Sequence, residues 1–291
     1  MEKHQELCYT HDRVREELYV DKEGDLKPIK FDNYNHSMRV PVKYTFDFEC
    51  MPTEYDDREE KEADESYTKK YQRHKPSGYN IRRVSKYPYI IPNKTISRTI
   101  QSADEDVTQT FYKDIEDDAC FVTNEYLRFP APMQLSYEKA ESFGYATNCH
   151  ICGEQLWDDR VQDHCHITGQ YRSAAHNKCN LNYQLPNFIP VFAHNMSGYD
   201  AHLFMRSLGL DEEKIDCITE NGEKYMSFSK SFKAYEYTNK EGKDITVYKK
   251  IRFLDSFRFM SSSLDQLVKN LKDKCKREDI DPRTVFKHLS E

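Results

Sequence analysis

The feature that most constrains this chain is a group of Cys and His residues near its middle. Cys149 and Cys152 are separated by two residues, and His176 and Cys179 repeat that spacing farther along. A tetrahedral zinc ion needs four N or S ligands, and ligands two residues apart can face one ion from a tight turn. The four residues therefore predict a zinc site that holds a small local fold together. The alternative is a set of reduced core Cys and surface His residues.

Composition limits how the rest of the chain is interpreted. The chain has 291 residues and 37% hydrophobic residues, enough for a sizeable core. Its nine Cys are too unevenly spread for a disulfide framework, which again favours metal. The formal net charge is −7, so DNA binding would require a local site rather than the overall charge.

No targeting or membrane segment is evident. The sequence has no apolar run long enough to span a bilayer, and MEKHQELCYTHDRVREEL at its start is charged throughout, unlike a signal peptide. We therefore expect an intracellular protein without a membrane partner.

Strand and helix patterns alternate along the chain. This mixture predicts an α/β or α+β domain that carries the Cys/His segment as an insert. An acidic run at 54–66 is expected to be a solvated loop. The expected elements are strands at 40–50 and 187–195, a helix at 197–210, a hairpin of 225–237 and 245–256, and a helix at 261–275.

Two acidic residues lie on the first predicted strand. Asp47 and Glu49 are two residues apart in TFDFEC, so both carboxylates point to the same face. Adjacent acids are costly unless water or a cation separates their charges, and two-metal nucleases use such pairs to hold Mg²⁺. Taken alone, the pair is also compatible with an exposed strand end.

The segment HNMSGYD follows the strand predicted at 187–195. It places Asn195, Tyr199 and Asp200 where that strand ends and a helix begins. A polar cluster at this position suits a binding or metal site. The alternative is a capping box in which Ser197 caps the helix.

The Cys/His segment resembles the ββα-metal (HNH) nucleases, in particular those of the recombination endonuclease VII type. The resemblance rests on DHCHITG between the ligand pairs and on CN at the second pair. It implies that Asp163 and Asn180 hold Mg²⁺ and that His164 is the general base, beside the zinc site. Cys165 stands where a second Asp is usual, and His176 stands where a Cys is usual.

The acidic segments together resemble the first two exonuclease motifs of family B DNA polymerases, D-x-E and N-x3-(F/Y)-D. The resemblance implies an RNase H-like fold in which Asp47, Glu49 and Asp200 bind the catalytic Mg²⁺ ions. It also implies that Asn195 and Tyr199 contact a single-stranded primer 3′ end.

The segment SLDQL resembles a third motif, (S/T)-L-x2-h, which belongs to the protein-primed branch of that family. It implies that Ser263 and Leu264 contact the primer or a terminal protein. The alternative is that these residues form only the cap and first turn of an amphipathic helix.

As a whole, the chain resembles the exonuclease region of protein-primed polymerases of Polinton or Maverick transposons and related viruses, with the zinc module inserted between the first two motifs. His4 and Cys8 resemble the end of a zinc finger. The third motif, Tyr-x3-Asp, is missing after Asp200, so an exonuclease fold incomplete at the C-terminus is expected. The implied parts are an extension at 1–40, exonuclease segments at 41–140 and 184–291, and the zinc module at 141–183.

These resemblances imply Mg²⁺-dependent 3′–5′ proofreading of DNA, at a nuclear, viral or transposon replication site, as part of a DNA polymerase. The sequence itself lacks the polymerase motifs, so this chain alone is not expected to synthesise DNA. Two alternatives stay open: an HNH endonuclease centred on His164, and an inactive zinc module that binds DNA or protein.

Overall fold

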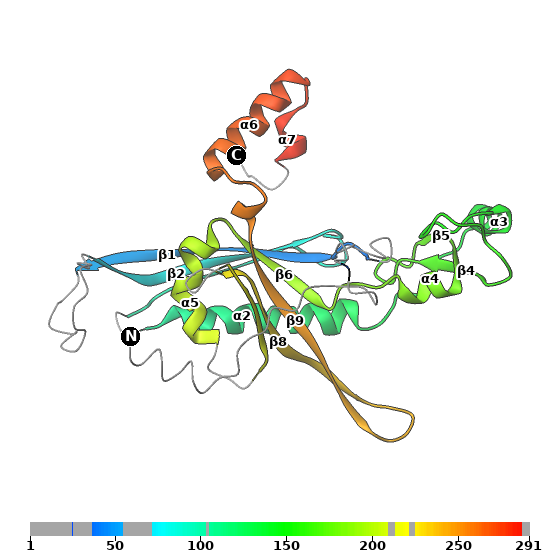
Figure 1. Cartoon of the computed structure of the whole chain (residues 1–291), viewed down its shortest axis with the longest axis horizontal. Helices are drawn as coiled ribbons and strands as arrows, with labels where there is room; N and C mark the ends of the chain where they lie inside the picture. The colour runs from blue at the N-terminus through cyan, green and yellow to red at the C-terminus, as the bar shows by residue number, and fades with distance from the viewer. Residues whose placement is uncertain are drawn as a thin grey trace.

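A large mixed sheet forms the centre of the protein. The computed structural model describes residue 25 and residues 37–54, 72–102, 105–208, 213–220 and 225–286. Seven strands form the sheet in the order β3-β2-β1-β6-β9-β8-β7, and β4 and β5 form a separate hairpin (Figure 1). The seven are β1 (Val42–Glu54), β2 (Gln72–Ser85), β3 (Lys94–Thr99), β6 (Phe188–Ala193), β7 (Ile215–Thr219), β8 (Tyr225–Thr238) and β9 (Asp244–Asp255).

Strand directions divide the sheet into antiparallel and parallel parts. β2 is antiparallel to both β3 and β1, whereas β6 is parallel to both β1 and β9. β9 then turns back through an antiparallel hairpin with β8, and β7 is antiparallel to β8. The prediction of mixed strands and helices is confirmed, as is the hairpin predicted from 225–237 and 245–256.

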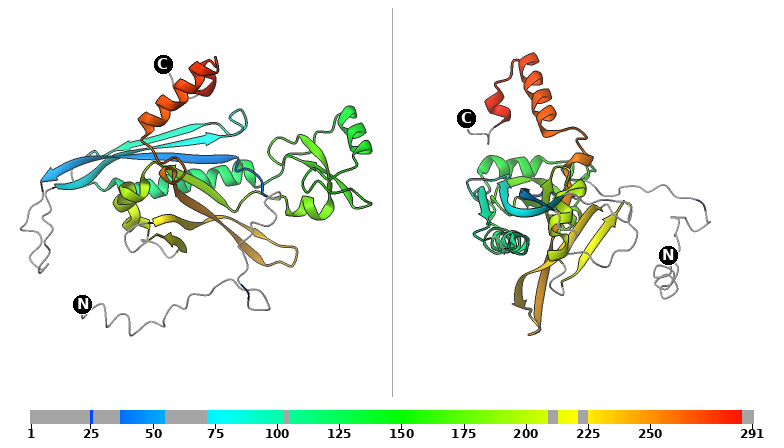
Figure 2. Two further views of the ribbon diagram at one scale, coloured as in Figure 1. Left: turned by 45° about the horizontal axis from the view of Figure 1, so that its top comes forward. Right: turned by 90° about the vertical axis from the view of Figure 1, so that its left-hand side faces the viewer.

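Helices α2 (Val107–Val122) and α5 (Asp200–Leu208) cover one face of the sheet (Figure 2). Alternation along β1 buries Phe46 on that face. Its ring centroid lies 4.9 Å from that of Phe111 on α2 and 5.6 Å from that of Phe204 on α5. Full burial of each such side chain contributes about 1.5–3 kcal/mol, so these rings join the helices to the sheet.

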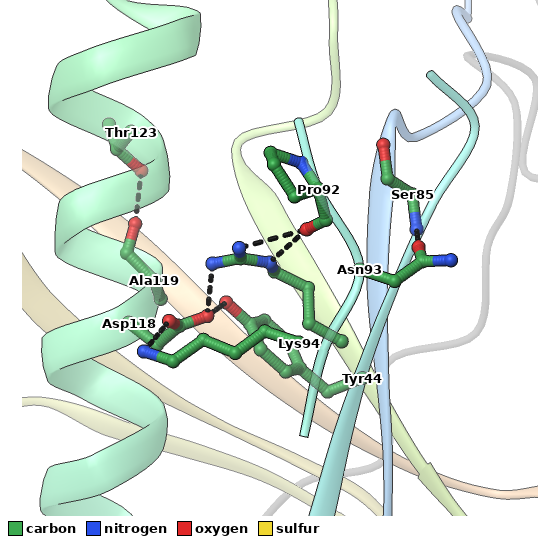
Figure 3. A network of polar contacts seen from close by, with 9 residues as sticks. Tyr44, Ser85, Pro92, Asn93, Lys94, Asp118, Ala119 and Thr123 are labelled. Carbon is green, nitrogen blue, oxygen red and sulfur yellow. Dashed lines mark hydrogen bonds and ion pairs between the residues drawn. The ribbon is translucent and has the colours of Figure 1, made fainter. Parts of the chain in front are cut away.

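A buried polar network also ties α2 to the sheet. The carboxylate of Asp118 accepts hydrogen bonds at 2.7 Å from Tyr44 Oη, Arg83 Nη1 and Lys94 Nζ, which come from β1, β2 and β3 (Figure 3). Burial, and then the charge of Asp118, raise the pKa of Tyr44, so its phenol stays protonated as a donor. The network fixes α2 across three strands.

Residues 137–183, here termed the Cys/His unit, lie at one end of the large sheet (Figure 1). The unit begins with α3 (Tyr137–Tyr145). Strands β4 (Arg160–His164) and β5 (Tyr171–His176) pair antiparallel, and α4 (Asn177–Asn182) follows directly. β1 begins on the side of this unit and runs away from it (Figure 1).

The last described residues form two helices, α6 (Leu264–Arg277) and α7 (Pro282–Val285), which project from the sheet (Figure 1). Helix α6 confirms the helix predicted at 261–275. Short helical turns lie at Thr123–Leu127, Met196–Gly198 and Ser256–Arg258. The zinc-finger remnant predicted at His4 and Cys8, and most of the acidic segment at 54–66, lie outside the described residues.

Candidate functional site

The four residues predicted to bind zinc come together. The ligand atoms of Cys149, Cys152, His176 and Cys179 all lie within 4.8 Å of one another. His176 Nδ1 is 3.5 Å from Cys152 Sγ and 3.8 Å from Cys179 Sγ. Donor atoms around a tetrahedral zinc ion would be roughly 3.8 Å apart, since Zn–S bonds are ~2.3 Å long. The cluster can hold a metal ion and is compatible with zinc.

Local backbone features arrange these ligands. Gly153 has φ +82° and donates its N–H to the carbonyl of Cys149, which closes the first turn. His176 ends β5, and Cys179 follows in α4. His176 Nε2 lies 2.9 Å from the carbonyl oxygen of Gln155 and therefore carries the proton, because a carbonyl only accepts. This leaves Nδ1 free to coordinate a metal.

The thiols repel one another when ionised. Burial, followed by hydrogen bonding and charge from Cys152 and Cys149, raises the pKa of Cys179. Burial would also raise the pKa of Cys149, but backbone N–H groups of the turn outweigh it and lower that pKa. A bound cation would supply the positive charge that lets all three thiols ionise together.

The acids predicted to form a nuclease site lie within electrostatic range of one another, although they are far apart in the sequence. Asp47 and Glu49 share the exposed face of β1, as predicted, and Asp200 begins α5. Burial raises the pKa of Cys50, and the charges of Asp200, Glu49 and Asp47 raise it further. All three carboxylates therefore lie within electrostatic range of one side chain.

Asp200 is a buried carboxyl group in an unfavourable setting. It is 5% exposed, and its Oδ1 has no hydrogen-bond partner among the described residues. Burial, and then the charge of Asp47, raise the pKa of Asp200 to about 6, while backbone N–H groups of Asp200 and Phe48 oppose the shift. An unpartnered oxygen beside a second carboxylate suits a cation, which would offset both costs.

Asp255, at the end of β9, fixes the segment that leads into Asp200. It is 1% exposed and accepts hydrogen bonds from the N–H groups of Asn195, Ser197 and Phe257, each at 2.9 Å. It also accepts one from Ser197 Oγ at 2.7 Å. The Ser197 hydroxyl therefore donates to Asp255, and α5 begins three residues later, at Asp200.

Asn195 and Tyr199 lie beside the acids on the surface. Asn195 has a left-handed backbone, φ 62°, and its amide packs against Gly198, where an added Cβ would lie 2.7 Å from Asn195 Oδ1. Tyr199 Oη is 2.7 Å from His74 Nδ1 on β2. Burial, and then contact with Cys50, raise the pKa of Tyr199 to about 12, so its hydroxyl stays neutral.

The residues predicted as an HNH site lie in the Cys/His unit. Asp163 is 2% exposed, and its carboxylate is engaged by His150 Nε2 at 2.8 Å and by Arg172 Nη1 at 3.0 and 3.1 Å. Burial would raise the pKa of Asp163, but these two partners lower it. His164, next in β4, is partly exposed, and Asn180 lies in α4. The Asp163 carboxylate is thus already neutralised by protein groups.

Ser263 caps α6. Its side chain accepts a hydrogen bond from the Gln266 N–H at 3.2 Å, and Leu264 is 56% exposed. This geometry matches the helix-cap alternative for SLDQL, and it leaves Leu264 accessible on the surface.

Three residues near the acids were not identified from the sequence: Cys50, His74 and Asp255. Asp255 had a usable signal, because it follows an apolar strand pattern as Asn195 does. The contact of His74 with Tyr199 had no signal in the sequence, because it depends on how β2 pairs with β1.

No family model, curated protein or solved structure matches this chain significantly. Within the described part of the chain, no helix is both long and apolar enough to cross a membrane.

Proposed function

We propose that this chain is the exonuclease region of a protein-primed family B DNA polymerase and removes nucleotides from single-stranded DNA 3′ ends with Mg²⁺. The observation that carries the proposal is the electrostatic proximity of Asp47, Glu49 and Asp200, whose charges all act on Cys50, together with a buried oxygen on Asp200 that has no hydrogen-bond partner among the described residues. Acids that lie on either side of the Cys/His unit in the sequence would thus share one site.

The strand order adds support. β3, β2 and β1 form an antiparallel set that continues into parallel β6 and β9. This is the arrangement expected of an RNase H-like sheet, in which the first strand carries the leading carboxylate. Asp47 occupies that position on β1.

Asp47, Glu49 and Asp200 would hold Mg²⁺, which supplies charge stabilisation for the phosphodiester and activates water when bound. Among the described residues, the ligand atoms of the Cys/His cluster lie close together, whereas these acids do not form such a closely spaced group. Mg²⁺ commonly takes only one or two carboxylates and completes its shell with water and substrate phosphate. Asp47 and Glu49 are exposed, so water and substrate can reach a cation held beside them.

Neighbouring side chains would position the DNA end. Tyr199 keeps its proton, and His74 orients its hydroxyl beside the acids. Asp255 holds the backbone of Asn195 and Ser197, and so sets where Asp200 begins its helix. In this role Asp255 is a positioning residue. Ser263 and Leu264 would contact primer or terminal protein on the surface of α6.

We infer in addition that the Cys/His cluster binds zinc as a structural ion. Four N and S ligands leave no open coordination position for a substrate. An HNH endonuclease receives less support, because His150 and Arg172 already occupy the Asp163 carboxylate that would hold Mg²⁺.

The direct test is digestion of single-stranded DNA labelled at its 5′ end, with the purified chain and Mg²⁺. We expect stepwise shortening from the 3′ end, reduced at least 100-fold in Asp47→Asn and in Asp200→Asn. Asp158→Asn, an exposed acid in the Cys/His unit, is the matched control. Activity that survives both changes, or plasmid nicking that His164→Ala abolishes, would overturn the proposal.

A further inference from the structure

A basic cleft lies between the Cys/His unit and the large sheet. It has a volume of about 610 Å³. Arg39 precedes β1, Lys86 follows β2, Lys249 lies on β9, and Arg172 and His166 come from the Cys/His unit. None of the described residues that line the cleft is Asp or Glu. The cleft therefore concentrates positive charge in a chain whose formal net charge is −7.

Three of these cations lack a counter-charge. Within the described ranges, no carboxylate lies within ion-pair distance of Arg39, Lys86 or Lys249. The nearest polar contact of Lys249 Nζ is Asn187 Oδ1 at 3.4 Å, and burial lowers the pKa of this ammonium group. Lys249 is thus a partly buried cation without a counter-charge among the described residues, whereas Arg39 and Lys86 are exposed and Lys86 Nζ lies 5.2 Å from the centroid of the Tyr87 ring. An anion in the cleft would offset the cost of burying Lys249 and would be attracted by the two exposed cations.

The walls of the cleft are joined by direct contacts. The N–H of Met38 donates to the carbonyl of Gln184 at 3.2 Å, which links the approach to β1 with the end of the Cys/His unit. Cys165 Sγ lies 3.7 Å from Tyr87 Oη, which links β4–β5 with the turn after β2. The cleft is therefore already formed and needs no rearrangement to accept a ligand.

We propose that this cleft binds backbone phosphates of DNA, an assignment that rests on the proposed function for the choice of polyanion. Pro41 lines the cleft and precedes β1, and Asp47 lies six residues farther along. At ~3.3 Å per residue the two sites are about 20 Å apart. The cleft would thus bind DNA away from the end that the acids act on.

The test is the salt dependence of single-stranded DNA binding in Mg²⁺-free buffer, measured by fluorescence anisotropy. The variant carries Arg39→Gln, Lys86→Gln and Lys249→Gln. Each lost phosphate contact lowers the slope of log K against log salt by ~0.7, so we expect a slope smaller by about 2. At the lowest salt we expect binding to be at least ~10-fold weaker.

The control carries Lys240→Gln, Lys243→Gln and Lys272→Gln, exposed residues whose loss changes the net charge equally. We expect it to keep the wild-type slope. Equal losses in both variants would show unspecific attraction and overturn the proposal, as would an unchanged slope in the cleft variant. Zinc content and circular dichroism report folding. If the triple variant does not fold, Lys86→Gln and Lys249→Gln alone must each lower the slope by about 0.7.

Failure of the proposed exonuclease function can be distinguished from failure of the cleft proposal. Asp200→Asn should reduce digestion at least 100-fold and keep the wild-type salt slope. A slope that falls in the cleft variant of a chain without nuclease activity would support the cleft and reject the exonuclease.

Discussion

The two candidate metal sites of this protein differ in how the chain builds them. The Cys/His ligands lie within Cys149–Cys179, on turns that one hairpin and one helix arrange, and their ligand atoms already face one another. The acids lie on β1 and α5, on opposite sides of that unit in the sequence. They come near one another because β6 pairs parallel with β1, and α5, which follows β6, packs on the face of the sheet over β1.

This difference is the one expected between a structural site and a reactive one. A closed set of four N and S ligands stabilises a fold, and it leaves no room for substrate. An open set of carboxylates with one unpartnered buried oxygen costs stability in the unliganded protein. Reactive sites commonly carry such a cost, because the strained groups are the ones that engage the ligand.

The largest expected effect is loss of the proposed zinc site. Apparent binding free energies for structural zinc are about 10–16 kcal/mol near neutral pH, so Cys149→Ser with Cys179→Ser should remove the metal and unfold the Cys/His unit. Metal analysis and hydrogen exchange measure this, with protection lost in β4 and β5 but kept in β1. Cys217→Ser, at an exposed Cys outside the cluster, is the control. Zinc retained by the double variant would contradict the ligand assignment.

The stability of the large sheet should depend on the buried network around Asp118 and not on the metal site. Asp118→Ala leaves Arg83 buried without its carboxylate, which should lower the free energy of unfolding by about 3–5 kcal/mol in urea denaturation. Asp265→Ala breaks an exposed pair with Lys269 and should cost under about 0.5 kcal/mol. Similar losses for both would show that the network contributes little. Zinc content should be unchanged in either variant.

Removing the positioning carboxylate should have a smaller effect. Asp255→Ala leaves the N–H groups of Asn195, Ser197 and Phe257 without an acceptor and should cost about 1.5–3 kcal/mol. Burial would raise the pKa of Asp255, but these bonds lower it, so its contribution is present above about pH 4 and is lost in stronger acid. Denaturation at pH 7 and pH 3 checks this. A variant cost that is the same at both pH values would contradict it.

Asp200→Asn should raise the free energy of unfolding instead of lowering it, and its effect should be the smallest. The folded-state pKa of Asp200 is raised to about 6, so wild-type stability falls as pH rises from about 4 to above 6. Asn carries no charge, and the variant should be about 1–2 kcal/mol more stable at pH 8, with no difference below about pH 4. Urea denaturation at both pH values measures the change. A variant less stable at pH 8 would show that the Asp200 charge supports the fold.

Local sequence patterns predicted many of the elements of this structure, but they could not predict which distant strands pair with one another. The alternation in β1, the β8–β9 hairpin and the candidate metal ligands each depend on short segments, and each lies where expected. Helix α2 was not predicted, although Val107, Phe111 and Ile115 repeat at four-residue spacing and gave a usable signal. Edge strand β3 has no buried residue and so carries no apolar alternation to recognise.

The sequence predicted which residues belong to the candidate site better than it predicted how they are arranged in space. The sequence pointed to Asp47, Glu49 and Asp200, but the sheet pairing that brings them together cannot be obtained from their spacing. The engagement of Asp163 by Arg172 and the hydrogen bonds to Asp255 depend on how distant segments pack. Such contacts decide whether a carboxylate is already neutralised by protein groups, as Asp163 is, or is still available to bind a cation.

The most direct test of the central claim is Mn²⁺ binding to the zinc-loaded chain, measured by electron paramagnetic resonance as the fraction of free Mn²⁺. The account predicts binding by the wild type and by Asp158→Asn, with affinity at least ~10-fold weaker in Asp47→Asn and in Asp200→Asn. Equal Mn²⁺ affinity in all four proteins would contradict it.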